Sequence, residues 1–158
     1  MNRSEHTVRR PRITGTLIFC LLASVPVIVS GNKPDIHNEV LIQSVTTWNG
    51  APIRYPAGTA EITSAKVSLE RGAETPFHCH PVPTFAYILS GILEVQTADG
   101  KRKRFKQGES MAEVINTWHK GKAAQGPVEI VVFYAGSKGV PTTITARTNN
   151  LASESCAP

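Results

Sequence analysis

Residues 72–91, GAETPFHCHPVPTFAYILSG, decide the fold, because they place two histidines one residue apart at the start of a β-prone segment. Successive side chains of a strand point to opposite faces, so His78 and His80 project to the same side, while Cys79 points away. A second stretch, residues 108–123, reads GESMAEVINTWHKGKA and supplies His119. Three imidazoles on a small β scaffold predict a metal site with open coordination positions.

The first thirty-one residues have the pattern of an export signal. Four arginines precede an uncharged run at residues 13–31, ITGTLIFCLLASVPVIVSG, which ends in small residues. We expect a signal peptide cleaved after Ser30 or Gly31. The alternative is an uncleaved membrane anchor, since the run approaches the roughly 20 residues that span a bilayer. In both cases the folded part leaves the cytoplasm.

The rest of the chain fits one modest, nearly neutral domain. The whole sequence has 158 residues, of which 41% are hydrophobic, and a net charge of +5. Residues 32–158 hold 13 basic and 11 acidic side chains, a net charge of +2. The basic run KRKRFK at residues 101–106 follows a turn signal, Asp99-Gly100, so we assign it to an exposed hairpin arm rather than to nucleic-acid binding.

Short β-prone segments separated by turn residues predict an all-β sandwich or small barrel. We expect an N-terminal arm at residues 32–59 with an edge strand at 39–47, a barrel at 60–146 and a loose polar tail at 147–158. Two continuously apolar segments, 85–89 and 128–134, predict strands buried on both faces. The other predicted strands are residues 60–69, 77–80, 92–97, 102–106, 110–115 and 142–146, with residue 84 opening the 84–89 segment.

Two cysteines, Cys79 and Cys156, remain beyond the leader. An oxidising compartment would permit them to pair, because disulfides persist there. The sequence does not place the tail beside Cys79, however. We therefore expect Cys79 to be a free, partly buried thiol, with the bridge as the alternative.

Together these residues resemble the two sequence motifs of the cupin family, over about residues 60–136. The first motif is Gly, five residues, His-x-His, three or four residues, Glu, six residues, Gly. Gly72, His78, His80 and Gly91 match it, but Thr84 stands where the family has its glutamate ligand. Of the second motif Gly108 and His119 match, whereas Val114, Asn116 and Ala123 replace its Pro, Gly and Asn. The resemblance implies a cupin double-stranded β-helix, a jelly-roll barrel.

The resemblance also implies a divalent metal ion held by His78, His80 and His119. Imidazole nitrogen binds zinc, iron, copper, nickel or manganese, so the sequence does not select among these metals. Three-histidine sites in the family resemble those of some iron-dependent dioxygenases that act on thiols and diketones. A homodimer is a further implication.

Glu113 is the residue whose orientation the sequence leaves open. It is an acid within the otherwise apolar run SMAEVI. Facing inward, it could be a fourth ligand, a hydrogen-bond acceptor for an imidazole N–H, or a catalytic general base. Facing outward, it would be an ordinary solvated side chain. Four aromatic residues could line the pocket or belong to the core: Phe85, Tyr87, Trp118 and Phe133.

Three functions remain open from the sequence. The first is an exported metal-dependent dioxygenase acting on a small chelating substrate. The second is a non-catalytic protein that binds a metal or small molecule. The third is a metal-assisted isomerase or lyase that uses Glu113 as its base.

Overall fold

A computed structural model describes residues 35–147, 151 and 156. The predicted signal peptide or anchor at residues 1–31 lies outside the described residues. The chain divides into two units at residue 37, and the fold described here is that of residues 38–158. Among the described residues no helix is long and apolar enough to cross a membrane.

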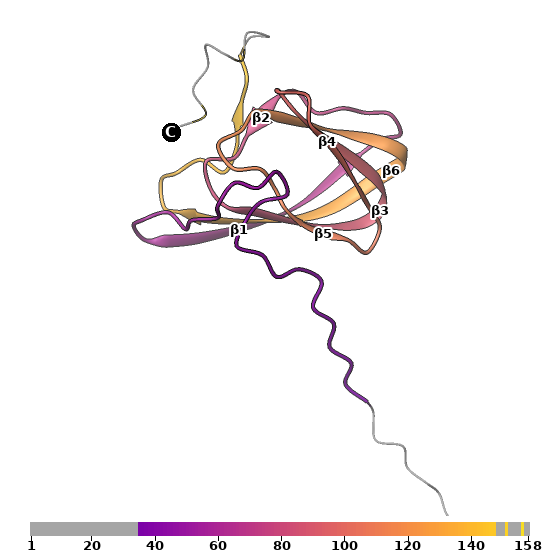
Figure 1. Cartoon of the computed structure of the whole chain (residues 1–158), viewed down its shortest axis with the longest axis horizontal. Coiled ribbons are helices and arrows are strands. Elements are labelled where there is room, and N and C mark those ends of the chain that lie inside the picture. Colours follow the sequence, from indigo (N-terminus) through magenta and orange to yellow (C-terminus); the bar gives the residue numbers. More distant parts are fainter. Residues whose placement is uncertain (1–34, 148–150, 152–155, 157–158) are drawn as a thin grey trace, which may run out of the picture. The chain divides into compact units, whose positions relative to one another are not determined.

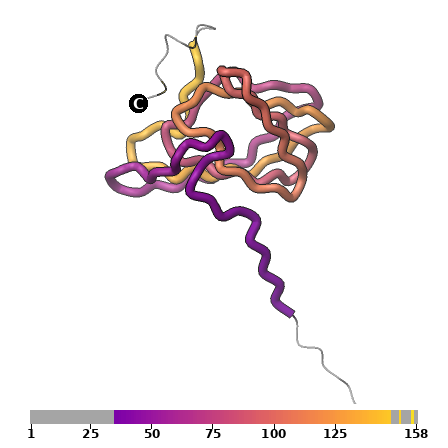
Figure 2. Tube along the Cα trace, in the orientation of Figure 1, coloured from indigo at the N-terminus to yellow at the C-terminus, as the bar shows by residue number. Residues whose placement is uncertain are grey.

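The fold is all-β, as predicted, and its strands curl into a barrel (Figures 1 and 2). All strand pairings are antiparallel, and the main order is β4-β3-β6-β2-β7, with β1 paired to β6 and β5 paired to β3. The strands are β1 Ala60–Leu69, β2 His78–Cys79, β3 Thr84–Thr97, β4 Arg102–Lys106, β5 Ser110–Ala112, β6 His119–Ser137 and β7 Ile144–Thr145.

Glycines allow β3 and β6 to run on where turns were predicted. The ladder between these two strands shifts register between Ile88 and Ser90, between Ser90 and Ile92, and between Ile92 and Leu93. Gly91, within the second shift, has a φ of +78°. Gly126 in β6 also has a positive φ, +70°. Positive φ suits glycine, and bulges of this kind bend a strand and increase its twist. The two strands therefore bend around the barrel instead of ending.

The core lies inside the barrel and is formed by every second residue of the long strands. In β6, Val128, Ile130 and Val132 are buried, whereas Phe133 is 47% exposed. The prediction that residues 85–89 and 128–134 are buried on both faces is therefore wrong. The side chains between the core residues face outward, among them Phe133 and the charged Glu129, which lies 2.6 Å from Lys66. The buried cluster comprises Leu69, Ala86, Ile88, Leu93, Val95, Phe105, Met111, Ala123, Val128, Ile130 and Val132.

The N-terminal arm differs from the prediction. Residues 39–45 form no strand, and only an isolated bridge joins Thr46 to Pro52. Apolar side chains of the arm are exposed, Val40 at 71% and Val45 at 82%. A strand needs a hydrogen-bonded neighbour. Within residues 39–45 only Val45 has one in the described part of the chain, since its carbonyl accepts from the Ile53 N–H at 2.9 Å.

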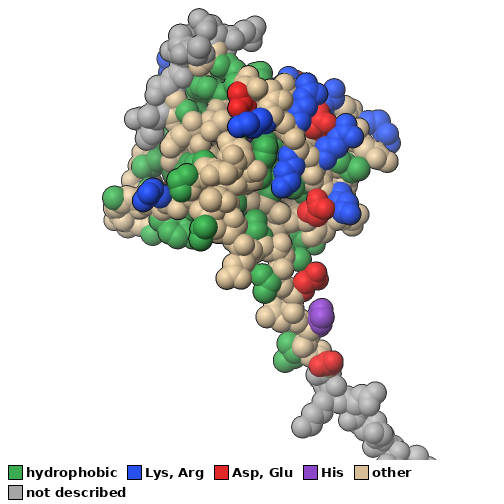
Figure 3. Space-filling model, viewed as in Figure 1, with side chains coloured by type: hydrophobic (Ala, Val, Ile, Leu, Met, Phe, Trp, Pro, Cys, Tyr) green, Lys and Arg blue, Asp and Glu red, His purple; other side chains and the backbone are tan. Residues whose placement is uncertain are grey.

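The predicted hairpin arm is present. Gly100 has a φ of +88° in the turn, and β4 pairs with residues 92–96 of β3. Two of its basic side chains contact one acid, since Arg104 Nε lies 2.7 Å and Arg102 Nη1 lies 3.4 Å from Glu94. Figure 3 shows basic and acidic side chains interspersed over this part of the surface.

The expectation of a free Cys79 is wrong. Cys79 is fully buried and bonded to Cys156, with 6.0 Å between their Cα atoms and a sequence separation of 77. The bridge sits in a small second core with Trp118, against Phe77, Ile144, Ala146 and Leu151. Cys156 is therefore bonded to the strand that carries His78.

Candidate metal centre

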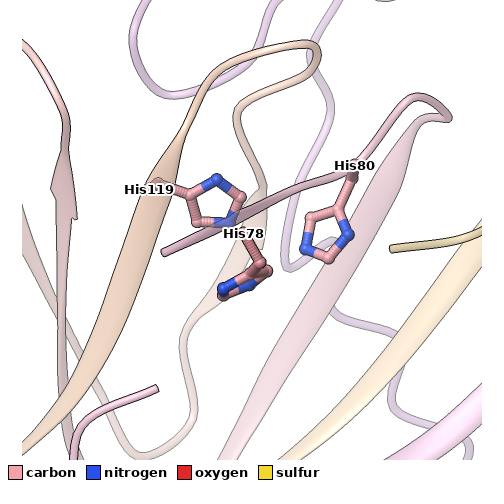
Figure 4. A group of neighbouring side chains, drawn as sticks. All are labelled: His78, His80 and His119. Atoms are coloured by element: carbon pink, nitrogen blue, oxygen red, sulfur yellow. The ribbon is translucent and has the colours of Figure 1, made fainter. Parts of the chain in front are cut away.

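The three histidines predicted as ligands converge. His78 in β2 pairs in register with His119 at the start of β6, and His80 follows one residue beyond β2. Their ring centroids are 4.4 to 5.1 Å apart, and Figure 4 shows the three rings gathered around one space. One ring nitrogen from each lies within 4.8 Å of the others, so the three could hold a metal ion.

Backbone carbonyls fix the orientation of all three rings. His78 Nδ1 lies 3.0 Å from the Pro76 oxygen, His80 Nδ1 2.9 Å from that of Thr142, and His119 Nδ1 2.8 Å from that of Thr117. A carbonyl oxygen only accepts, so each neutral ring carries its proton on Nδ1 and keeps a bare lone pair on Nε2. Metal-binding histidines are commonly oriented in this way.

Glu113 faces the same space, which excludes the solvent-facing alternative. It lies directly after β5, is 8% exposed, and its Oε2 is 3.3 Å from Nε2 of both His80 and His119. Ligand atoms about 2.1 Å from one ion are roughly 3.0 to 3.4 Å apart in octahedral or tetrahedral geometry. The carboxylate therefore lies at a separation that suits a fourth ligand.

Thr84, at the position of the family's glutamate, takes no part in the site. Its hydroxyl donates to the Val82 carbonyl at 3.1 Å, and its side chain is 2% exposed. Its main chain, however, is directly opposite Glu113, whose N–H donates to the Thr84 oxygen at 2.8 Å. The acid therefore lies opposite the motif's glutamate position, on the segment that pairs with β3 there.

Asn116 explains how the second motif keeps its turn without glycine. Its φ is +49°, and it is the only non-glycine residue with positive φ in the described part of the chain. Asparagine tolerates this left-handed conformation better than most residues. Its N–H also donates to the His80 carbonyl at 2.9 Å, which ties the turn to a predicted ligand.

Burial and neighbouring charges shift the ionisation of the site. Burial, and then the proximity of His119, lower the pKa of His78 to about 4. Burial would lower the pKa of His80, but the Glu113 carboxylate and the Thr142 carbonyl outweigh it and raise that pKa. Burial opposes ionisation of Glu113, yet His119 and His80 together hold its pKa well below the usual range. The carboxylate is therefore ionised at neutral pH.

The donor set fits a divalent cation. His119 Nε2 is buried and has no hydrogen-bond partner, because the contact with Glu113 lacks hydrogen-bond geometry. A buried lone pair without a partner is costly, and a metal ion would satisfy it. Three neutral imidazoles and one carboxylate carry a charge of −1, which would offset half the charge of such an ion.

The site opens into a cavity of about 250 Å³. Tyr134 lines it, and its ring centroid lies 5.4 Å from that of His80. Burial raises the pKa of this phenol. The alternation of Ile130, Val132 and Tyr134 along β6 could have identified Tyr134 as inward-facing from the sequence. No sequence signal near the histidines predicts that the exposed Thr143 and Thr145 lie at the cavity edge.

None of the four aromatic residues considered from the sequence lines this cavity. Trp118 packs against the disulfide, and Phe85 and Phe133 lie in a separate apolar groove on the outside of the barrel. Tyr87 alternates with the buried Ala86 and Ile88 and so also faces outward.

The antiparallel barrel and its cluster of inward-facing histidines define a class of small β-barrel proteins equipped to hold a metal ion. Residues 65–134 match the sequence profile of the Cupin_2 cupin domain. The chain thus contains a cupin domain, and the resemblance inferred from its two motifs is confirmed.

Solved structures with the same fold are distant in sequence. DMSP lyase DddQ from Ruegeria pomeroyi is 19% identical, with a TM-score of 0.50; the match covers 64% of this chain and 49% of the lyase. This chain therefore spans about half the length of that lyase. An uncharacterised double-stranded β-helix protein from Klebsiella pneumoniae is 22% identical, with a TM-score of 0.48 and coverage of 70% and 100%.

An RmlC-like cupin from Methanocaldococcus jannaschii is 16% identical, with a TM-score of 0.46 and coverage of 65% and 87%. A comparison with curated proteins gave no match. At 19% identity the likeness to the lyase bears on the fold alone.

Proposed function

We propose that this cupin is a metal-dependent enzyme acting on a small molecule with a chelating head group. The observation that carries the proposal is the convergence of three oriented imidazoles and the ionised Glu113 at the wall of a cavity. A structural zinc site uses all its coordination positions for protein ligands. Here the ligand set adjoins space in which a substrate can reach the ion.

The first reaction class we propose is oxidation of the dioxygenase type. A bound divalent ion would supply Lewis acidity and, if it is iron, the capacity to react with oxygen. The protein's own residues would orient the substrate and exclude water. The walls suit this role, since Leu93, Val95 and Ile130 are apolar and buried, and closed apolar sites suppress side reactions with water.

A metal-assisted isomerase or lyase is the second candidate, and it is favoured by Glu113 and Tyr134. Both line the cavity, one as an ionised carboxylate and the other as a neutral phenol. A carboxylate and a phenol in one cavity could take up and return a proton at a substrate carbon. This chemistry would need no oxygen.

Metal analysis of the purified mature protein tests the proposal. We expect about one ion per chain, and loss of most of it in His78→Ala and His119→Ala. With metal bound, oxygen uptake across a panel of thiols, diketones and enols identifies the dioxygenase. Turnover without oxygen identifies the lyase or isomerase. Metal retention without turnover in any metal form would support a binding protein instead.

An exchange of two residues tests whether Glu113 is a ligand. Glu113→Thr should lower metal affinity by at least tenfold, and Thr84→Glu combined with Glu113→Thr should restore it, because the two positions face each other. Thr84→Val alone is the control and should leave affinity unchanged. Full affinity in Glu113→Thr would rule out the ligand role and leave that of a base.

Export is part of the proposal, and the disulfide supports it. A buried bridge between Cys79 and Cys156 fits an oxidising compartment. We also propose a homodimer, for which the exposed apolar side chains of the arm and the outer groove offer surface. That the protein binds no nucleic acid remains a prediction. It is supported by Glu94, whose carboxylate contacts two arginines of the basic run.

A further inference from the structure

The cavity lining has two chemically different parts. One comprises the imidazoles and Glu113, with the exposed Thr143 and Thr145 beside them. The other is hydrocarbon and is formed by six side chains from three strands: Val67, Leu69, Leu93, Val95, Ile130 and Val132. A ligand held at the metal therefore extends onto an apolar surface.

The charges along the cavity restrict what can be bound. Among its lining residues Glu113 is the only acid, and none is lysine or arginine. A divalent ion together with the donor set would have a net charge of +1. Such a site can neutralise one negative charge on a ligand, but it holds no partner for a second. Phosphates and dicarboxylates therefore fit poorly, and so do sugars, because the six aliphatic side chains offer no hydrogen bonds.

The volume restricts the length of the ligand. A cavity of about 150 Å³ lined by aliphatic and aromatic side chains accommodates benzene, with its six carbons. By proportion, a cavity of about 250 Å³ holds roughly ten non-hydrogen atoms. A bidentate head of four atoms would leave room for about six carbons in the tail.

We infer that the substrate is a small monoanionic chelator with a hydrocarbon tail of about six carbons, its head at the histidines and its tail against the six aliphatic side chains. This inference rests on the proposed function, since it requires a bound metal ion. Beyond the proposed function, the inference specifies the part of the substrate that does not contact the metal.

Binding of alkyl hydroxamates to the zinc-loaded protein tests the inference by titration calorimetry. Hydroxamates are monoanionic bidentate ligands, and a series from acetohydroxamate to decanohydroxamate varies only the tail. We expect affinity to rise about fourfold per methylene and to level off near six carbons. An analogue that ends in a second carboxylate should bind far more weakly.

Two neighbouring residues of β6 provide a matched pair of variants. Val132 is 4% exposed and faces the cavity, whereas Val131 alternates with it on the outer face. Val132→Phe should shorten the tail length at which affinity levels off, and Val131→Phe should not. If Val132→Phe does not fold, Val95→Ile adds one methylene to the same cavity wall and should lower the limit by about one carbon.

Zinc stoichiometry, measured first, separates the possible failures. A protein that holds neither zinc nor any of the other divalent ions named above would overturn the proposed function, and this inference with it. A protein that holds zinc and binds every hydroxamate equally well would overturn the inference alone. Equal binding of the dicarboxylate analogue would also overturn it.

Discussion

Removal of the Cys79–Cys156 bridge by a double serine substitution should lower both stability and metal affinity. The bridge closes a loop across 77 residues of sequence. The chain-entropy relation for such a loop gives about 4.5 kcal/mol at 25 °C. For a folded unit of this size that corresponds to a fall in Tm of roughly 15 °C. Native-state adjustments reduce such values, so we expect a loss between about 2 and 4.5 kcal/mol.

The effect on metal affinity follows from the position of Cys79. β2 has only two residues, His78 and Cys79, and it contacts β6 and β7 through few pairs. Cys79 lies between two proposed ligands, and the bridge anchors it from behind. Without that anchor the His78 and His80 rings should be less firmly placed. We expect a loss in affinity of about tenfold or more, as for other groups that orient metal ligands.

Urea unfolding of the chelator-treated protein measures the loss of stability. Competition with a chromogenic chelator, at a temperature well below the Tm, measures the loss of metal affinity. Val128→Ala is the control, because it removes fully buried atoms far from β2 in sequence. It should cost stability by about 1 to 3 kcal/mol without changing affinity. Unchanged affinity in the double serine variant would refute the anchoring role. Free thiols in the native protein would refute the bridge itself.

Three further predictions concern single positions. Gly91→Ala should destabilise the protein more than Gly100→Ala, because both have positive φ but only at Gly91 would a Cβ lie 2.3 Å from the Pro127 oxygen; urea midpoints compare them. His119→Ala should reduce bound metal to a trace by elemental analysis with the fold retained by circular dichroism, and persistent stoichiometric binding would contradict the site. In the metal-free protein, the free energy of unfolding should fall by up to about 3 kcal/mol as the pH drops from about 6.5 to 4. The reason is that only the unfolded state protonates His78 in that pH range. His78→Gln should flatten this part of the plot of unfolding free energy against pH.

The strands that the sequence predicted best are those whose ends have strong local signals. Residues 60–69 and 102–106 match β1 and β4. The second of these follows an Asp-Gly turn. The two long strands were each expected to break at glycine, because a positive φ serves a turn and a bulge equally well. Only the ladder on the neighbouring strand distinguishes these outcomes, and a single segment does not contain that information.

The predictions for the N-terminal arm and for Cys79 were wrong for a related reason. Residues 39–47 have β propensity, but propensity forms a strand only where another segment supplies hydrogen bonds. The bridge depends on Cys156 lying next to β2, although the two cysteines are separated by 77 positions in sequence. Both outcomes depend on long-range pairing. The histidines were easier to predict, because His-x-His parity on a strand is a local property.

Glu113 shows how a carboxylate can lie beside the histidines although the motif position for it holds threonine. Thr84 and Glu113 are linked across the β3–β5 ladder, since Phe85 pairs with Ala112 and the Glu113 N–H donates to the Thr84 oxygen. Cβ atoms of directly opposite residues are about 4.5 to 5.5 Å apart and lie on the same face of the sheet. A glutamate side chain is long enough to cover that distance, so an acid on either strand can reach the histidines. An acid at either of these two positions could therefore lie beside the histidines, and the sequence motif records only one of them.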